Sequence, residues 1–293
     1  MEKEPSAVKG TLYVCATPIG NLEDITIRAL RVLRRVDLIA CEDTRKARIL
    51  LARYHVRTPL LSCHQHNEAA RAEEILENLH QGKNVALLSE AGTPGISDPG
   101  EKVIRRAIDA GIPVVALPGP TAFVTALVVS GLPLRRFTFE GFPPRQPAAR
   151  RRYLEALATE ERTMIFYEAP HRLKETLGDM YRAWGSREAA VARELTKVHE
   201  EVIRGRLHQI LEHFERHEPR GEVVIVVAGC RGEPEDIQWE RLLAEVKEYH
   251  EKGYPPSRAV QKVARRHGVH KSELYRRWLD GETVNPKGPS RQS

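Results

Sequence analysis

A short apolar run followed at once by small residues is the part of the sequence best suited to chemistry. Residues 85–88 (VALL) have the composition of a buried parallel strand. The next residues, 89–100 (SEAGTPGISDPG), combine glycine, proline, hydroxyl and carboxylate side chains. Gly92 and Gly95 can adopt backbone angles closed to other residues, and Pro94 fixes its own φ. Such a loop at the carboxyl end of a strand lets a ligand approach the backbone, although a tight turn without a ligand explains the same residues.

The residues before and after this loop alternate between strand and helix. The apolar runs expected to form strands lie at residues 11–15, 36–41, 58–63, 85–88 and 113–117. The stretches between them have the apolar spacing of helices, which predicts an α/β domain with a parallel sheet covered on both faces. The stretch at 122–130 (AFVTALVVS) is almost wholly apolar, so we expect a helix that is buried on all sides.

A second α/β segment with a mixed sheet is expected next, and a small helical segment follows it. The β-branched run at 222–228 should be central in this second sheet. Beyond residue 233, stretches with helical spacing flank the turn at 267–269, which is typical of a helix-turn-helix. We therefore predict three domains and a disordered tail, with boundaries at 10–132, 133–232, 233–281 and 282–293.

The composition excludes several classes of protein. The chain has 293 residues, of which 41% are hydrophobic and 29% are charged, as in ordinary globular proteins. It lacks both the roughly 20-residue apolar run of a membrane span and the apolar core of a secretory signal, so we expect a cytoplasmic protein without a membrane partner. The four cysteines are scattered, so no metal site is expected. The net charge of +6 favours an anionic partner, and residues 241–281 hold ten Lys/Arg against five Asp/Glu.

Six motifs in order indicate a known family. They are TPIGNLEDIT (17–26), CEDTR (41–45), SEAGTPGISDPG (89–100), LPGPTA (117–122), FYEAPHR (166–172) and ARELTK (192–197). Over about residues 10–230, and into the helical tail, the sequence resembles the tetrapyrrole methylase superfamily, and within it the branch that methylates small-subunit ribosomal RNA. The members that modify tetrapyrroles usually carry a GxGPGD-like first loop and Gly-Asp-Pro after the fourth strand. Here TPIGN (17–21) and GTP (92–94) stand at those places, which favours the RNA branch.

The resemblance implies an activity, a cofactor and partners. The activity would be S-adenosylmethionine-dependent 2′-O-methylation of a cytidine ribose in the decoding region of 16S ribosomal RNA, with the RNA or the small ribosomal subunit as partner. It also implies two α/β domains, a cofactor in the cleft between them, and a homodimer.

The resemblance further implies which residues contact the cofactor. They are Pro18, Gly92, Thr93, Pro94, Gly95, Ser97, Pro118, Gly119, Thr121, Ala122, Tyr167, Ala169 and Pro170. Main-chain atoms beside glycine and proline suit such a pocket, because in-line methyl transfer needs alignment and the exclusion of water. For each of these residues taken singly, a role in a turn or in packing is the alternative.

A ribose hydroxyl is a poor nucleophile until its proton is drawn away, so a general base is expected. Glu90 and Glu168 are favoured as catalytic residues. The other candidates near strand ends are Glu42, Asp43, Asp98, His171 and Glu194. Each carboxylate has a second explanation, because it can cap a helix or pair with a neighbouring arginine.

Basic side chains are expected to bind RNA phosphates. The candidates are Arg45, Arg145, Arg151, Arg172, Lys197, Arg258, Lys262, Arg265, Arg266 and Arg276, with Arg150 and Arg152 beside them in the sequence. A solvated helix face explains such a cluster equally well.

Two other functions remain open. One is a small-molecule methyltransferase that acts on a tetrapyrrole precursor, and the other is a non-catalytic RNA-binding assembly factor. A nicotinamide dehydrogenase is disfavoured, because no G-x-G-x-x-G follows the first expected strand.

Overall fold

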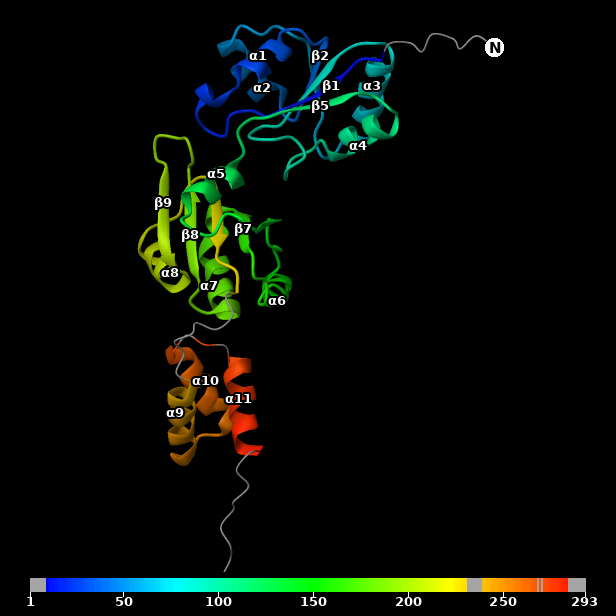
Figure 1. Cartoon of the computed structure of the whole chain (residues 1–293). Helices are drawn as coiled ribbons and strands as arrows, with labels where there is room; N and C mark the ends of the chain where they lie inside the picture. Colours follow the sequence, from blue (N-terminus) through cyan, green and yellow to red (C-terminus); the bar gives the residue numbers. More distant parts are fainter. Residues whose placement is uncertain (1–8, 231–238, 268, 270, 284–293) are drawn as a thin grey trace, which may run out of the picture. The chain divides into compact units, whose positions relative to one another are not determined.

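The computed structural model describes residues 9–230, 239–267, 269 and 271–283 (Figure 1). The chain divides into two compact units. The first holds the chain up to Val129 together with Ala192–Val202 and Gly221–Val224, and the second holds the remainder. The first segment of the first unit ends at Val129, three residues before the predicted boundary at residue 132. The two later segments that return to the first unit have no counterpart in the predicted boundaries.

The first unit is built on a five-stranded parallel sheet. Its strands are β1 (Leu12–Cys15), β2 (Leu38–Cys41), β3 (Leu60–Ser62), β4 (Val85–Leu88) and β5 (Val114–Leu117). Their order is β3-β2-β4-β1-β5. The register pairs Cys15 with Leu88 on one side and with Leu117 on the other, so the carboxyl ends of β4, β1 and β5 are neighbours.

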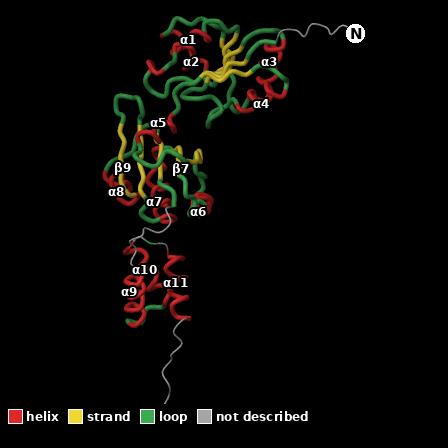
Figure 2. Tube along the Cα trace, viewed as in Figure 1, coloured by secondary structure: helices red, strands yellow, loops and turns green. Residues whose placement is uncertain are grey.

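Helices cover both faces of this sheet. They are the short 3-10 helix η1 (Leu22–Asp24), α1 (Ile27–Leu33), α2 (Thr44–Arg53), α3 (Glu68–His80) and α4 (Glu101–Asp109). Neighbouring residues of a strand point to opposite faces. Accordingly, Leu88 packs in one core cluster with Leu33 of α1, and Leu87 packs in the other with Ile75 of α3. Figure 2 shows the strands between the two helical layers.

A buried carboxylate anchors the loop that follows β4. Glu68 of α3 is 5% exposed, and its Oε1 accepts hydrogen bonds from the N–H groups of Gly100 (2.9 Å) and Lys102 (3.0 Å). Gly100 precedes α4 and has no side chain, so Glu68 supplies the N-terminal cap that the glycine lacks. This contact fixes the far end of the 89–100 loop against α3.

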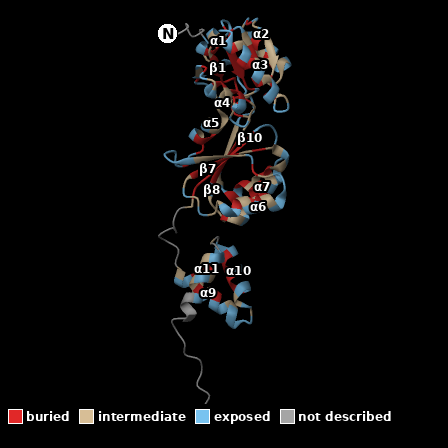
Figure 3. Ribbon diagram, turned by 90° about the vertical axis from the view of Figure 1, so that its right-hand side faces the viewer, coloured by how far each residue is buried: buried red, intermediate tan, exposed pale blue. Residues whose placement is uncertain are grey.

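The second sheet has the order β6-β7-β10-β8-β9. Its elements are β6 (Phe137–Gly141), α6 (Pro147–Ala156), β7 (Thr163–Glu168), the 3-10 helix η2 (Pro170–Arg172), α7 (Leu173–Trp184), β8 (Glu188–Arg193), β9 (Glu201–Arg206), α8 (Leu207–Arg216) and β10 (Val223–Val227). All five residues of β10 are buried, and the strand is central as predicted (Figure 3). The predicted two-domain α/β fold is confirmed.

Three helices make up the described C-terminal part. They are α9 (Trp239–Glu251), α10 (Pro256–His267) and α11 (Lys271–Thr283). Val246, Val260 and Leu274, one from each helix, are completely buried in a shared apolar cluster. The predicted helix-turn-helix includes Gly268, which lies outside the described residues, as do the predicted domain edge at 233 and most of the predicted tail. None of the described helices is both long and apolar enough to cross a membrane.

The apolar helix after β5 differs from its prediction. In α5 (Ala122–Val129), Ala126 and Leu127 are buried, but Val124 is 44% exposed and Val128 is 62% exposed. The prediction of burial on all sides was wrong, because a helix of eight residues presents only one stripe to its neighbours even when every stripe is apolar.

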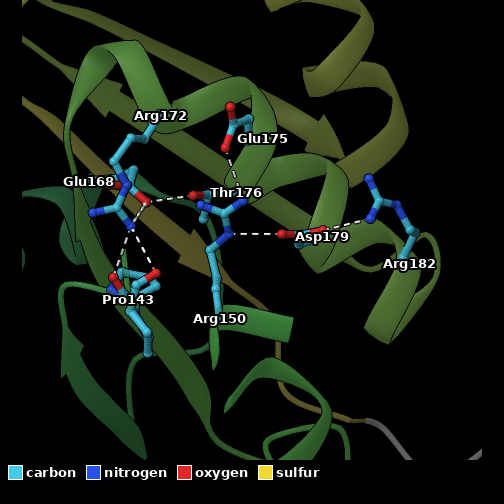
Figure 4. A network of polar contacts seen from close by, with 9 residues as sticks. Pro143, Arg150, Glu168, Arg172, Glu175, Thr176, Asp179 and Arg182 are labelled. Atoms are coloured by element: carbon cyan, nitrogen blue, oxygen red, sulfur yellow. Dashed lines mark hydrogen bonds and ion pairs between the residues drawn. The ribbon is translucent and has the colours of Figure 1, made fainter. Parts of the chain in front are cut away.

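A buried ion pair joins α6 to α7 in the second unit, and two more exposed side chains extend it (Figure 4). Arg150 is only 2% exposed, and its Nε donates to Asp179 Oδ2 at 2.8 Å. Arg182 pairs with the other oxygen of Asp179, and Glu175 pairs with Arg150 Nη2. Arg150 is therefore a structural residue rather than part of an exposed basic loop.

Candidate functional site

The loops after β1 and β4 are joined by main-chain hydrogen bonds. Thr17 and Gly92 each donate an N–H group to the other's carbonyl, at 2.9 and 3.0 Å. The Thr17 hydroxyl donates to the carbonyl of Ser89, and the Ser89 hydroxyl donates to that of Gly92. Thr17 and Ser89 were not among the predicted site residues. Ser89 follows β4 directly and Thr17 follows β1 after one residue, so the signal was a small hydroxyl residue close behind a buried strand.

The loop after β5 contacts both of these loops. The hydroxyls of Thr93 and Thr121 lie 2.8 Å apart. A Cβ atom added to Gly119 would stand 2.7 Å from the Cβ of Ala16, so only glycine allows this approach. The structure thus brings the predicted residues Gly92, Thr93, Gly119 and Thr121 together at one edge of the sheet.

The remaining predicted cofactor residues of this unit belong to the same loops. Pro18 follows Thr17 and is buried, whereas Pro118 and Gly119 are exposed. Gly92, Gly95 and Ser97 have φ angles of 84°, 81° and 63°. A left-handed serine is strained, and such strain concentrates at functional sites. Pro94 and Ala122 complete the predicted set in these loops.

Carboxylates cluster beside the β4 loop. Burial is the main cause that raises the pKa of Asp98 to about 6, and the nearby charges of Glu42, Glu90 and Glu222 raise it further. Burial, followed by Glu90, also raises the pKa of Glu42. Glu90 itself pairs with Lys46, its Oε2 lying 2.5 Å from Nζ. Asp98 is thus a carboxyl group whose pKa suits proton transfer near neutral pH.

The predicted base Glu168 has a different environment (Figure 4). Its carboxylate is fully buried, Oε1 accepts from the N–H of Ala169, and Oε2 accepts from the hydroxyl of Thr176 at 2.5 Å. Arg172 Nη2 lies 3.2 Å from Oε2 and also donates to the carbonyls of Pro143 and Pro144. These contacts favour structural roles for Glu168 and Arg172 over roles as base and phosphate ligand.

Three predicted cofactor residues lie in the second unit. Tyr167 packs edge-on against Phe139 and Phe142, with ring centroids 4.9 and 5.5 Å apart. Ala169 and Pro170 begin η2 directly after β7. Their predicted contact with the cofactor remains a prediction.

A large cavity lies beside the first loop of the first unit. It has a volume of about 760 Å³ and is lined by Gly20–Glu23, Arg53, Tyr54 and residues 196–198. Its lining comes from the first and the last of the six sequence motifs. These two motifs are in close contact, since a Cβ on Gly20 would stand 2.5 Å from Lys197 Cγ. Lys197 Nζ pairs with Glu194 (2.9 Å) and Glu222 (3.2 Å), so its charge is largely compensated. This lowers its value as the predicted phosphate ligand.

The predicted RNA-binding cations of the C-terminal helices divide into two kinds. Three of them have partners: Lys262 lies over the rings of Tyr249 and Tyr254, Arg266 pairs with Glu245, and Arg276 pairs with Glu273. Arg258 and Arg265 are exposed and make no side-chain hydrogen bond or ion pair with a described residue. Outside these helices, Arg45, Arg145 and Arg151 are also exposed.

Replacing Gly119 should disrupt the three-loop arrangement. In Gly119→Val the new side chain collides with Ala16, so we expect the β5 loop to shift and the affinity for S-adenosylhomocysteine to fall by about tenfold or more, measured by calorimetry. The control is Gly178→Ala, whose Cβ would meet nothing nearer than 3.8 Å. Equal affinity in the two variants would contradict this account of the loops.

Asp98 should make stability depend on pH. Its folded pKa of about 6 exceeds the unfolded value, so the folded state holds the proton more tightly and stability falls as pH rises from about 4 to 6. Asp98→Asn cannot ionise, so its melting temperature should exceed that of the wild type at pH 7 and match it near pH 4. A difference that is the same at both pH values would contradict the assigned environment.

The comparisons with known proteins agree with this architecture. A family model described as Tetrapyrrole (Corrin/Porphyrin) Methylases matches residues 11–211. Among solved structures, diphthine synthase superposes with a TM-score of 0.58 at 13% identity, covering 75% of this chain and 90% of that one. Cobalt precorrin-4 methyltransferase superposes with a TM-score of 0.54 at 16% identity, covering 74% and 94%.

Several relatives with higher identity align with most of the chain. The chain is 44% identical over 271 residues to ribosomal RNA small subunit methyltransferase I of Halalkalibacterium halodurans, covering 91% of this chain and 94% of the relative. It is 47% identical over 271 residues to the protein of that name from Xylella fastidiosa, covering 91% and 98%. The Thermotoga maritima protein is 48% identical over 220 residues, covering 75% and 99%. On this similarity and on its fold, the chain belongs to the tetrapyrrole methylase family.

Proposed function

We propose that this protein transfers a methyl group from S-adenosylmethionine to the ribose 2′-hydroxyl of a cytidine in the decoding region of 16S ribosomal RNA. The observation that carries the proposal is similarity over nine-tenths of the chain, at 44% and 47% identity, to proteins named ribosomal RNA small subunit methyltransferase I. The choice of cytidine, 2′-oxygen and decoding region rests on the sequence resemblance.

The loops after β4, β1 and β5 fit the cofactor. Gly119 is exposed and brings main-chain atoms to the surface of the site, and the half-buried hydroxyls of Thr93 and Thr121 can hydrogen-bond to a polar ligand. When bound, S-adenosylmethionine supplies an activated methyl group. The loops hold its position through contacts that are already formed between them, so little ordering accompanies binding.

The carboxylates beside the β4 loop support a role in proton transfer. Asp98, with a pKa of about 6, is largely ionised at neutral pH and can accept the proton of the attacking hydroxyl. Glu90 was the favoured base of this cluster, but its carboxylate is already engaged in an ion pair with Lys46. We therefore rank Asp98 first and Glu90 second as the general base, and we propose a structural role for Glu168.

Further elements of the proposal concern partners. The exposed cations of α10 supply a phosphate-binding surface for the RNA or the assembled small subunit. By resemblance, we infer that the enzyme is a cytoplasmic homodimer.

The direct test is methyl transfer in vitro. The purified protein is incubated with methyl-labelled S-adenosylmethionine and either small ribosomal subunits, deproteinised 16S RNA or a precorrin. We expect the label on a single cytidine ribose of the ribosomal RNA, located by mass spectrometry of nuclease fragments. Label on the precorrin alone would support a tetrapyrrole methylase, and RNA binding without transfer would support an assembly factor.

The unpaired cations of α10 should contribute to RNA affinity but not to cofactor affinity. In the double variant Arg258→Gln/Arg265→Gln, we expect weaker RNA binding and a salt dependence whose slope is smaller by about 2, since each phosphate contact contributes about one unit. Affinity for S-adenosylhomocysteine should not change. A matched double variant is Arg135→Gln/Arg136→Gln, because both side chains are exposed and make no hydrogen bond or ion pair with a described residue. If it weakens RNA binding equally, α10 has no specific role.

A further inference from the structure

The cavity between the first loop and residues 196–198 has no assigned role. Its volume of about 760 Å³ lies in the range of about 300–1,000 Å³ that small-molecule sites occupy. It begins at Gly20, three residues after Thr17 of the cofactor loops, so these two residues are at most about 11 Å apart. A ligand in this cavity therefore lies near one of the loops proposed to hold the cofactor.

The wall formed by residues 194–200 is held in an unusual conformation. Glu194 and Thr196 have φ angles of 50° and 65°, a left-handed region that ordinary side chains avoid. Thr196 Oγ1 accepts from the N–H of Asn21 at 2.9 Å, and the N–H of Thr196 donates to Glu200 Oε2 at 2.6 Å. Gly20 packs so tightly against this wall that no side chain fits there. The strain is thus maintained by contacts that shape the cavity, which is typical of functional sites.

The opposite wall combines an aromatic ring with a free cation. The hydroxyl of Tyr54 donates to the carbonyl of Leu22 at 2.5 Å, and Arg34 Nη2 donates to the carbonyl of Tyr54 at 2.9 Å. These bonds fix the ring and its backbone. Arg53 is exposed, and its side chain makes no hydrogen bond or ion pair with a described residue. A fixed ring and an uncompensated guanidinium together suit a stacked base and a phosphate.

Polar groups that can read a base edge complete the lining. Asn21 offers a side-chain amide, and Glu23 offers a carboxylate that can accept from an amino group such as cytosine N4. Val198 is 96% exposed and adds an apolar contact at the cavity. This mixture of one ring, one free cation, hydrogen-bonding groups and an apolar residue matches a nucleotide better than a purely apolar ligand.

The surroundings of the cavity carry excess positive charge. Residues 27–57, which include α1 and α2, hold nine Lys/Arg against three Asp/Glu. This excess is as large as the net charge of the whole chain, and the sequence analysis attributed the basic character to the C-terminal helices instead. A polyanion approaching the first unit is therefore attracted to the helices that carry Arg53 and Tyr54.

We propose that this cavity binds a nucleotide of single-stranded RNA adjacent to the methylated ribose, with its base on Tyr54 and its phosphate at Arg53. The inference rests on the proposed function, because it names where that RNA contacts the first unit. The competing occupant is part of the cofactor. Its methionine carboxylate could also pair with Arg53, so the affinity of the variants for S-adenosylhomocysteine separates the two occupants.

The test compares single variants of the full chain. Arg53→Gln removes the free cation, and Tyr54→Leu removes the ring while keeping an apolar side chain, since Tyr54 also packs against the core. Arg48→Gln is the matched control, because Arg48 is exposed on the same helix, its side chain makes no hydrogen bond or ion pair with a described residue, and it does not line the cavity. Tyr54→Phe keeps the ring. Binding of a fluorescent single-stranded RNA spanning the decoding-region cytidine is measured over a range of salt concentrations, together with the melting temperature.

For Arg53→Gln we expect RNA affinity to fall about fivefold and the salt slope to decrease by about 1. For Tyr54→Leu we expect a loss of about tenfold, and Tyr54→Phe and Arg48→Gln should stay close to wild type. Affinity for S-adenosylhomocysteine should be unchanged throughout. If Tyr54→Leu lowers the melting temperature, its loss of affinity could reflect unfolding. The inference is then tested by the RNA affinities of Arg53→Gln and Arg48→Gln.

Two results would overturn the inference. One is equal RNA affinity in Arg53→Gln and Arg48→Gln, and the other is a loss of S-adenosylhomocysteine affinity in Arg53→Gln. The proposed function fails separately, if the wild type binds the RNA and transfers no methyl group. In that case, the order of RNA affinities among the variants still supports the cavity as a nucleotide site.

Discussion

The structure of the first unit depends on the parallel register that makes β4, β1 and β5 neighbours. Because the three strands run the same way and end together, the loops after them meet at one edge. The paired hydrogen bonds between Thr17 and Gly92 lock two of these loops, and the close approach of Gly119 to Ala16 brings in the third. Neither contact is possible if one strand shifts by a residue, since a shift would turn each buried side chain to the other face.

Much of this arrangement could be predicted from the sequence, because it follows from local pattern. Alternating apolar runs gave the parallel sheet, and Gly92 and Gly119 marked the places of close approach. The burial of individual charged side chains and the identity of their ion-pair partners could not be predicted, because both depend on residues far apart in the chain. Glu168 and Arg150 look like exposed functional residues in the sequence, yet they are enclosed by partners such as Thr176 and Asp179.

Pairing separates structural charges from charges available to a ligand. Lys197 belongs to one of the six sequence motifs but lies between two carboxylates, whereas Arg53 belongs to no motif and has no side-chain partner among the described residues. The same criterion distinguishes Arg258 from Arg266 in α10. Sequence alone gives the number and order of charges, and only the fold shows which of them compensate one another.

The return of Ala192–Val202 and Gly221–Val224 to the first unit has a consequence for biosynthesis. The amino-terminal sheet emerges from the ribosome long before these segments. During that time the cavity lacks the wall that residues 196–198 provide. Residues 196–198 reach Gly20 only after the intervening chain has been made, and this contact spans about 175 positions, as in the bond from Asn21 to Thr196. The cavity therefore stays incomplete until residues 196–198, which follow the first three strands of the second sheet, have been translated.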